Sequence, residues 1–172
     1  MPRIVVGEPN TTDTESRGPP RTEREMKINL RQVVPAALLA TLTLDLSGLL
    51  LTGKWWDIPN LLGAKLGTGL AGGLVMHYGI GLVLAVIFVA VAPALKGPLW
   101  VRALTYMTVQ TVMGVFLFMF PLLDLGVAGL KAGAMMPVIA LTRHLLYGLA
   151  LAVVLRKSEL TVSAPAKLSF EV

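Results

Sequence analysis

Four stretches of the chain are almost entirely apolar, and each is long enough to cross a lipid bilayer. They run approximately from Val33 to Leu51, from Ala71 to Leu95, from Ala103 to Leu123 and from Pro137 to Leu155. About 20 apolar residues, rising 1.5 Å each, match the thickness of the hydrocarbon core. Helix-breaking residues separate the stretches at 52–54, 96–98 and 124–126. The pattern predicts an all-α membrane protein, a bundle of four transmembrane helices.

The polar segments divide the chain into three parts. Residues 1–25 are rich in Thr, Pro, Arg and Glu and lack the apolar core of a secretory signal, which predicts a polar N-terminal tail. Residues 26–157 form the predicted transmembrane domain, and residues 158–172 form a C-terminal tail. Between the first two spans, the segment from Gly63 to Gly67 predicts a short interfacial or re-entrant helix that leads into the second span.

Composition supports a lipid environment and excludes several functions. Hydrophobic residues make up 55% of the chain and charged residues 15%, against roughly 25% charged residues in soluble domains. The sequence has no basic stripe with interleaved aromatic residues, which argues against nucleic-acid binding. It has no cysteine, so disulfides, thiol catalysis and iron–sulfur ligation are excluded.

Positive residues near the predicted spans are concentrated on one side of the membrane. That side carries eight, namely Arg21, Arg24, Lys27, Arg31, Lys96, Arg102, Arg156 and Lys157, and the other side carries Lys54, Lys65 and Lys131. Cytoplasmic loops are enriched in Lys and Arg. The sequence therefore predicts that both termini are cytoplasmic.

The two halves of the sequence resemble each other at an offset of 67 residues. This offset places Asp57 on Asp124 and His77 on His144, and six of the ten positions in 77–86 are identical to their counterparts. The similarity predicts a tandem two-helix repeat, whose copies have the same orientation and are related by a pseudo-twofold axis along the membrane normal. The two histidines should then lie at the same depth.

Small residues recur every fourth position along the second and fourth spans, on the same face as the histidines. They predict a helix-packing seam, because small residues allow helix backbones to approach closely in lipid. The predicted seam residues are Gly69, Gly73, Gly81, Ala140 and Gly148.

Four ionisable residues lie within the predicted spans: Asp45, His77, Arg143 and His144, with Gln110 as a neutral companion. Such groups are costly in hydrocarbon and are normally paired or functional. The expected resolution is an Asp45–Arg143 ion pair with one histidine as hydrogen-bond partner.

Three interpretations of this polar cluster remain open. It can be a structural clasp between helices. It can be a tetrapyrrole site, in which His77 and His144 ligate a haem or chlorophyll-type pigment and Arg143 binds a propionate. It can be a transport or proton pathway that uses Asp45 and the histidines. No metal-ligand motif or nucleophile motif is present, which argues against an enzyme.

Several motifs resemble a family of small bacterial four-span membrane proteins catalogued only as uncharacterised. They are Asp57-Ile-Pro-Asn-Leu-Leu-Gly, His77-Tyr-Gly-Ile-Gly, Met136-Pro-Val and His144-Leu-Leu-Tyr-Gly, within the region from Val33 to Leu155. The resemblance implies the same four-span fold and a location in the bacterial inner membrane. It implies no activity.

The small size, the seams, the polar tail and the lack of catalytic motifs predict a non-catalytic accessory subunit. Its expected partners are lipid and the subunits of a larger membrane complex, of a respiratory or other energy-converting kind.

Overall fold

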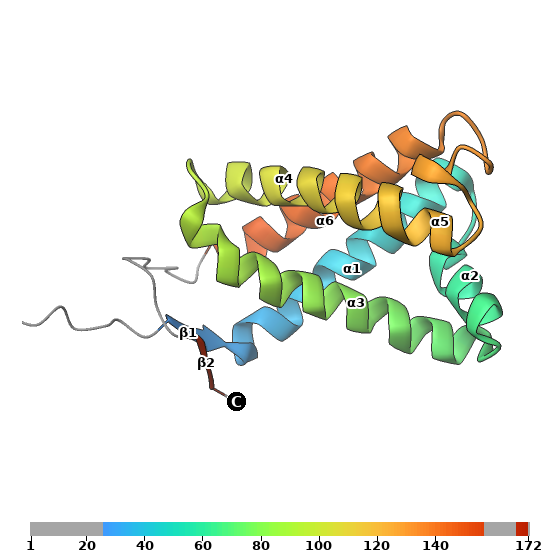
Figure 1. Ribbon diagram of the computed structural model, residues 1–172. Coiled ribbons are helices and arrows are strands. Elements are labelled where there is room, and N and C mark those ends of the chain that lie inside the picture. Colours follow the sequence, from blue (N-terminus) through green and yellow to red (C-terminus); the bar gives the residue numbers. More distant parts are fainter. Residues whose placement is uncertain (1–25, 157–167, 172) are drawn as a thin grey trace, which may run out of the picture.

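The computed structural model describes residues 26–156 and 168–171 of the chain. The helices α1 (Leu30–Thr52), α3 (Gly69–Val91) and α6 (Met136–Leu155) lie alongside a third span of three successive segments (Figure 1). All four spans are long and apolar enough to cross a membrane. The predicted four-helix transmembrane bundle is thereby confirmed. The predicted N-terminal tail and most of the C-terminal tail lie outside the described residues.

The third span is continuous from Leu99 to Leu122, but its hydrogen-bonding pattern changes along its length. It begins as α4 (Leu99–Gln110), continues as the π-helix η2 (Thr111–Met119) and ends as α5 (Phe120–Leu122). Nine residues is long for a π-helix, since these usually form single-turn bulges and occur often at functional sites. This change from α-helix to π-helix was not predicted from the sequence.

Short elements connect the spans. The helix α2 (Asp57–Leu66) follows α1 and packs closely against α3. The 3₁₀ segments η1 (Ala92–Ala94) and η3 (Val127–Gly129) lie between α3 and α4 and between α5 and α6. The short helix predicted around residues 63–67 is therefore present, and it begins earlier, at Asp57. Whether it is interfacial or re-entrant stays a prediction.

Two strands lie near the start of α1. The strand β1 (Met26–Asn29) pairs in parallel with β2 (Leu168–Glu171), so part of the predicted C-terminal tail returns to the start of the transmembrane domain (Figure 1). Asn29 caps α1, because its side-chain oxygen accepts a hydrogen bond from the backbone N–H of Arg31 at 3.1 Å.

The packing of the spans is asymmetric. The helix α1 packs against both α3 and α6, and α6 also packs against α4. Within the described residues, α3 makes no comparably close backbone contact with α4 or η2. The spans are therefore arranged in the order α3, α1, α6, α4, with α3 and the third span least tightly joined.

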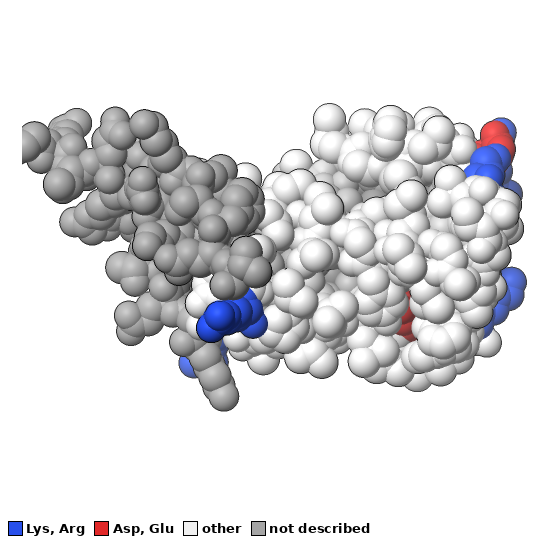
Figure 2. Space-filling model, turned by 90° about the horizontal axis from the view of Figure 1, so that it is seen from below, with Lys and Arg blue, Asp and Glu red and all other residues white. Residues whose placement is uncertain are grey.

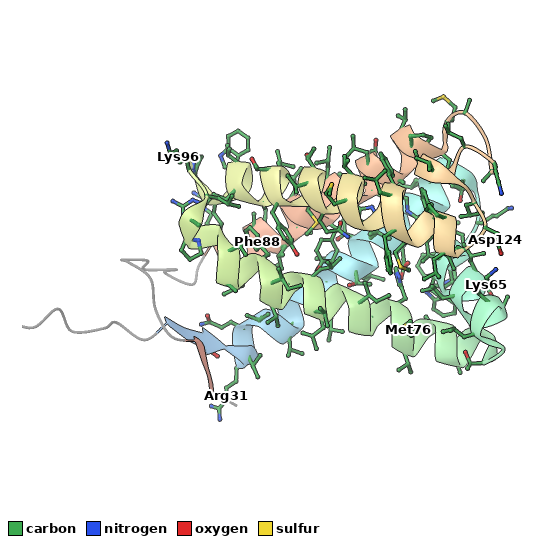
Figure 3. All side chains as sticks on the ribbon, viewed as in Figure 1. Arg31, Lys65, Met76, Phe88, Lys96 and Asp124 are labelled. Atoms are coloured by element: carbon green, nitrogen blue, oxygen red, sulfur yellow. The ribbon has the colours of Figure 1, made fainter. Side chains whose placement is uncertain are left out.

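Charged side chains lie at the two ends of the bundle. Arg31 and Lys96 are at one end, and Lys65 and Asp124 are at the other (Figure 3). On the face seen in Figure 2, a broad band that is almost free of charged residues separates the two ends. The positive-inside rule predicts that the end with Arg31 and Lys96 faces the cytoplasm. We call it the inner end and the opposite one the outer end.

The inner half has a close-packed apolar core. Small side chains from neighbouring helices, such as Ala36 and Ala40 of α1 and Ala85 of α3, are fully buried there. Larger residues, including Phe88, Met107 and Leu151, fill the remaining space. Alanine allows the backbones to approach closely, so dispersion contacts can hold helices together without a hydrophobic driving force.

The two hairpins of the predicted repeat share one packing contact. A Cβ atom on Gly81 of α3 would collide with the Thr41 side chain of α1, and a Cβ on Gly148 of α6 would lie 2.8 Å from Met107 of α4. Each glycine thus allows the first span of its own hairpin to pack closely against the second. The symmetry does not extend to the contacts between the hairpins. The helix α1 packs closely on α6, whereas the corresponding pair, the third span and α3, has few backbone contacts.

The predicted seam residues contact several different neighbours. Gly81 and Gly148 make the contacts described above, and Ala140 is buried beside Val115 and Phe120 of the third span. Gly73 lies against the backbone of α2 rather than against another span. A Cβ on Gly69 would have no atom within 4 Å, but the Gly69 backbone carbonyl lies so close to Gly63 of α2 that a Cβ on Gly63 would collide with its oxygen. Gly69 has a φ of +64°, a conformation that glycine adopts readily at the start of α3.

The contrast between two glycines of α3 gives a test of this packing. We expect Gly81→Ala to destabilise the protein by about 1–3 kcal/mol, because the new methyl group overpacks the contact with Thr41. We expect Gly79→Ala to be neutral or stabilising by up to about 1 kcal/mol, because the same methyl group meets open space. Unfolding in mixed micelles measures both. Equal effects of the two substitutions would contradict the packing.

Candidate functional site

The ionisable residues of the spans gather in the outer half of the bundle. Asp45 lies seven residues before the outer end of α1, and His77, Arg143 and His144 lie seven or eight residues after the outer ends of α3 and α6. At 1.5 Å per residue, all four are roughly 10–12 Å along their helices from that end. The predicted common depth of His77 and His144 along their helices is therefore confirmed.

Asp45 is fully buried and holds two neighbours on α3. Its Oδ1 lies 3.0 Å from His77 Nε2, and its Oδ2 accepts a hydrogen bond from the Tyr78 hydroxyl at 3.1 Å. The His77 side chain is 9% exposed and that of Asp45 is 0% exposed. Both carboxylate oxygens are therefore engaged, as a charge in hydrocarbon requires.

Arg143 pairs with Asp57, at the first position of α2. The guanidinium donates from Nη1 to Asp57 Oδ2 at 2.7 Å and from Nη2 to Asp57 Oδ1 at 2.9 Å. The predicted Asp45–Arg143 pair is therefore wrong. Asp57 lies at the outer end, where its carboxylate remains 19% exposed, and the long arginine side chain reaches it from inside the bundle. Asp45 instead contacts His77 and Tyr78 of α3.

Two features of α1 shape the space around Arg143. Its Nε donates to the Leu44 carbonyl at 3.3 Å. A Cβ on Gly48 would lie 2.7 Å from the Arg143 Cζ, so a larger residue at this position would force the guanidinium to move. Arg143 thus joins α6 to α1 and α2 at once.

His144 has a different environment from its repeat counterpart His77. Its Nδ1 lies 2.8 Å from the Ala140 carbonyl one turn earlier on α6. A carbonyl oxygen only accepts hydrogen bonds, so Nδ1 carries the proton and Nε2 of the neutral ring is an acceptor. The two imidazoles are therefore at equal depth but are not chemically equivalent.

Both histidines line a cavity of about 120 Å³. It lies among α1, α2, α3, the third span and α6, and its walls are mostly apolar. Gln110, the last residue of α4, is also part of the wall. Its Oε1 is the one buried side-chain oxygen or nitrogen without a hydrogen-bond partner in the described part of the chain.

These residues do not fit a haem held by both histidines. His77 Nε2 is engaged by Asp45, and the Arg143 guanidinium, expected to bind a propionate, is engaged by Asp57. The cavity of about 120 Å³ is also well below the roughly 300–1,000 Å³ of sites for larger ligands. A chlorophyll-type pigment meets the same obstacles.

A second aspartate–cation pair lies at the outer surface. Lys65 of α2 forms an ion pair with Asp124, the repeat counterpart of Asp57, and the Asp124 side chain is 78% exposed. The hydrogen bond from Lys65 lowers the pKa of Asp124 below its ordinary value of 3.8. This contact thus favours the folded state above that ordinary value, and the effect is lost as the pH falls through the lowered pKa. Its exposure makes the contribution small.

Three participants in the cluster were missed or misplaced from the sequence. Asp57 and Tyr78 appear in the sequence analysis only through the repeat and the resemblance motifs, with no role in the cluster, and Gly48 was not singled out. A signal for Tyr78 exists, because it follows His77 directly and its hydroxyl can reach a group near the imidazole. The roles of Asp57 and Gly48 depend on where α2 and α6 lie in space.

No protein-family profile, curated protein or solved structure matches the chain. In the described residues, no group of three or more His, Cys, Asp or Glu side chains could hold a metal ion.

Proposed function

We propose that the protein is a non-catalytic accessory subunit that binds a larger membrane complex within the bilayer. Gly79, near the middle of α3, carries this proposal. It is exposed, and a Cβ added there would have no atom within 4 Å. Glycine within a helix costs about 1 kcal/mol relative to alanine, and no contact in the described part of the chain explains it. Close approach of a helix from another protein would explain it.

The surroundings of Gly79 suit such an approach. From 71 to 83, exposed residues of α3 recur every fourth position at Ala71, Val75, Gly79 and Val83, and none of these four is larger than valine. The larger exposed side chains of α3 nearby, Met76 and Ile87, flank this stretch. The exposed face of α1, by contrast, carries leucines such as Leu38, Leu42, Leu46 and Leu49. A face of small residues lets a partner helix come near enough for dispersion contacts, which drive helix association in lipid.

The polar cluster supports a role without chemistry of its own. Asp45, Asp57, His77 and Arg143 are all engaged with one another in pairs. On the inner side of the cluster, the core of the described helices is apolar and closely packed. A proton or ion pathway through this chain alone would need titratable or hydrated groups in that half.

The test is co-purification of the tagged full-length chain in mild detergent. We expect the wild type to migrate with a larger complex, and Gly79→Leu to reduce the recovered partner at least tenfold. Leu46→Phe, on the exposed face of α1, is the matched control and should retain the partner. Mass spectrometry of the partner chains would decide whether the complex is of the energy-converting class.

Recovery of the wild type as a lone 18.4 kDa chain would overturn the proposal. Retention of the partner by Gly79→Leu would remove α3 as the docking face. Circular dichroism and melting of the purified variants establish that Gly79→Leu is folded, as the open space around this position predicts.

A further inference from the structure

We infer that the cavity beside the histidines is a binding site for a small lipid-soluble molecule with one aromatic ring and a hydroxyl group, that is, a phenol. This inference goes beyond the proposed function and does not depend on it. It rests on the size of the cavity, the polar atoms at its wall and the way the helices enclose it.

The size and lining of the cavity suit one ring. Its volume is about 120 Å³, and a dry apolar cavity of about 150 Å³ is known to bind benzene. Ile80, Leu84, Val115 and Ile139 supply apolar side chains to the wall. A water molecule needs two to four polar partners, so an apolar ring fits most of this space better than water does.

The polar atoms at the wall favour a ligand that donates a hydrogen bond. His144 Nδ1 is turned to the carbonyl of its own helix, which directs the Nε2 edge of the ring away from α6. The apolar surroundings favour the neutral imidazole, in which Nε2 is an acceptor. Gln110 Oε1, also an acceptor, is buried without a partner among the described residues. An acceptor at the wall is complemented by a hydroxyl group, which donates one hydrogen bond, and not by a carbonyl, which donates none.

Residues of both α3 and η2 line the cavity, and these two segments are not among the closely packed element pairs of the described structure. We therefore expect a lipid-soluble molecule to enter from the bilayer between them. The π-helix η2 begins directly after Gln110 and forms part of the wall, and such helices are common at functional sites.

The experiment measures binding of para-fluorophenol and para-fluorotoluene to the full-length protein in lipid nanodiscs by fluorine NMR. The two probes have the same shape and differ only in the hydroxyl group. We expect the wild type to bind the phenol about tenfold more tightly, as one additional hydrogen bond allows. His144→Phe should abolish this preference and leave toluene binding unchanged.

Filling the cavity provides the second arm. Ile80→Trp, inside the cavity, should weaken both probes at least tenfold, whereas Val83→Trp, exposed on the same helix, should change neither. Ile139→Trp replaces Ile80→Trp should that variant fail to fold.

Equal affinity for both probes in the wild type would overturn the inference. Affinities that survive cavity filling would show partition into lipid and would also overturn it. Gly79→Leu should bind both probes normally, which separates this site from docking.

Discussion

Asp57→Ala is expected to destabilise the protein by about 3 kcal/mol, although Asp57 lies outside the spans and is partly exposed. The substitution leaves the Arg143 guanidinium inside the bundle with one remaining acceptor, the Leu44 carbonyl. Removing one member of a buried pair costs far more than an exposed ion pair contributes, because the other charge stays uncompensated. Unfolding of the purified variant in mixed micelles measures the loss.

Two comparisons make this prediction specific. Asp124→Ala removes the repeat counterpart of Asp57, whose pair with Lys65 is exposed, and should change stability little. The double variant Asp57→Ala/Arg143→Met should be more stable than Asp57→Ala alone, because no charge remains unpaired. Additive losses in the double variant would contradict the ion pair.

His77→Leu is expected to destabilise the protein by about 3 kcal/mol, whereas His144→Leu should cost about 1 kcal/mol. Loss of His77 leaves the fully buried Asp45 carboxylate with only the Tyr78 hydroxyl. Loss of His144 removes one hydrogen bond within α6, beside a cavity that can accommodate the change. The two variants are compared by the same unfolding measurement.

The result for His77 can be separated from a simple packing defect. Asp45→Asn in the His77→Leu background should restore about half of the lost stability, since it removes the isolated charge. Tyr78→Phe should cost about 1 kcal/mol, the contribution of one hydrogen bond. Equal losses for His77→Leu and His144→Leu would mean that the buried pair with Asp45 has no energetic role.

The two histidines show which features an internal repeat predicts and which it does not. The offset of 67 residues correctly places both imidazoles at one depth and both seam glycines against the first helix of their own hairpin. It does not extend to the neighbours of the histidines. Arg143 corresponds to Met76, which is 42% exposed, and Asp45 corresponds to Val112. The polar partners exist in one copy only, so the chemistry of the two sites differs.

The pairing of Arg143 shows where prediction from spans alone fails. Depth places Asp45, Arg143 and the histidines together, and opposite charges at one depth suggest a pair. Arginine, however, reaches several ångströms along the helix axis toward the water, and α2 places Asp57 where that side chain ends. The position of the short connecting helix α2, which the pattern of spans does not give, therefore determines which carboxylate pairs with Arg143.

The sequence by itself determined the number and length of the spans and the position of the polar groups along them, because these depend on hydropathy and helix rise. Only the tertiary structure decided which groups pair, that η2 is a π-helix, and that a cavity lies beside the histidines. These features depend on the rotation of each helix about its axis and on the position of α2. Both are set by contacts between residues far apart in the chain, which local pattern does not encode.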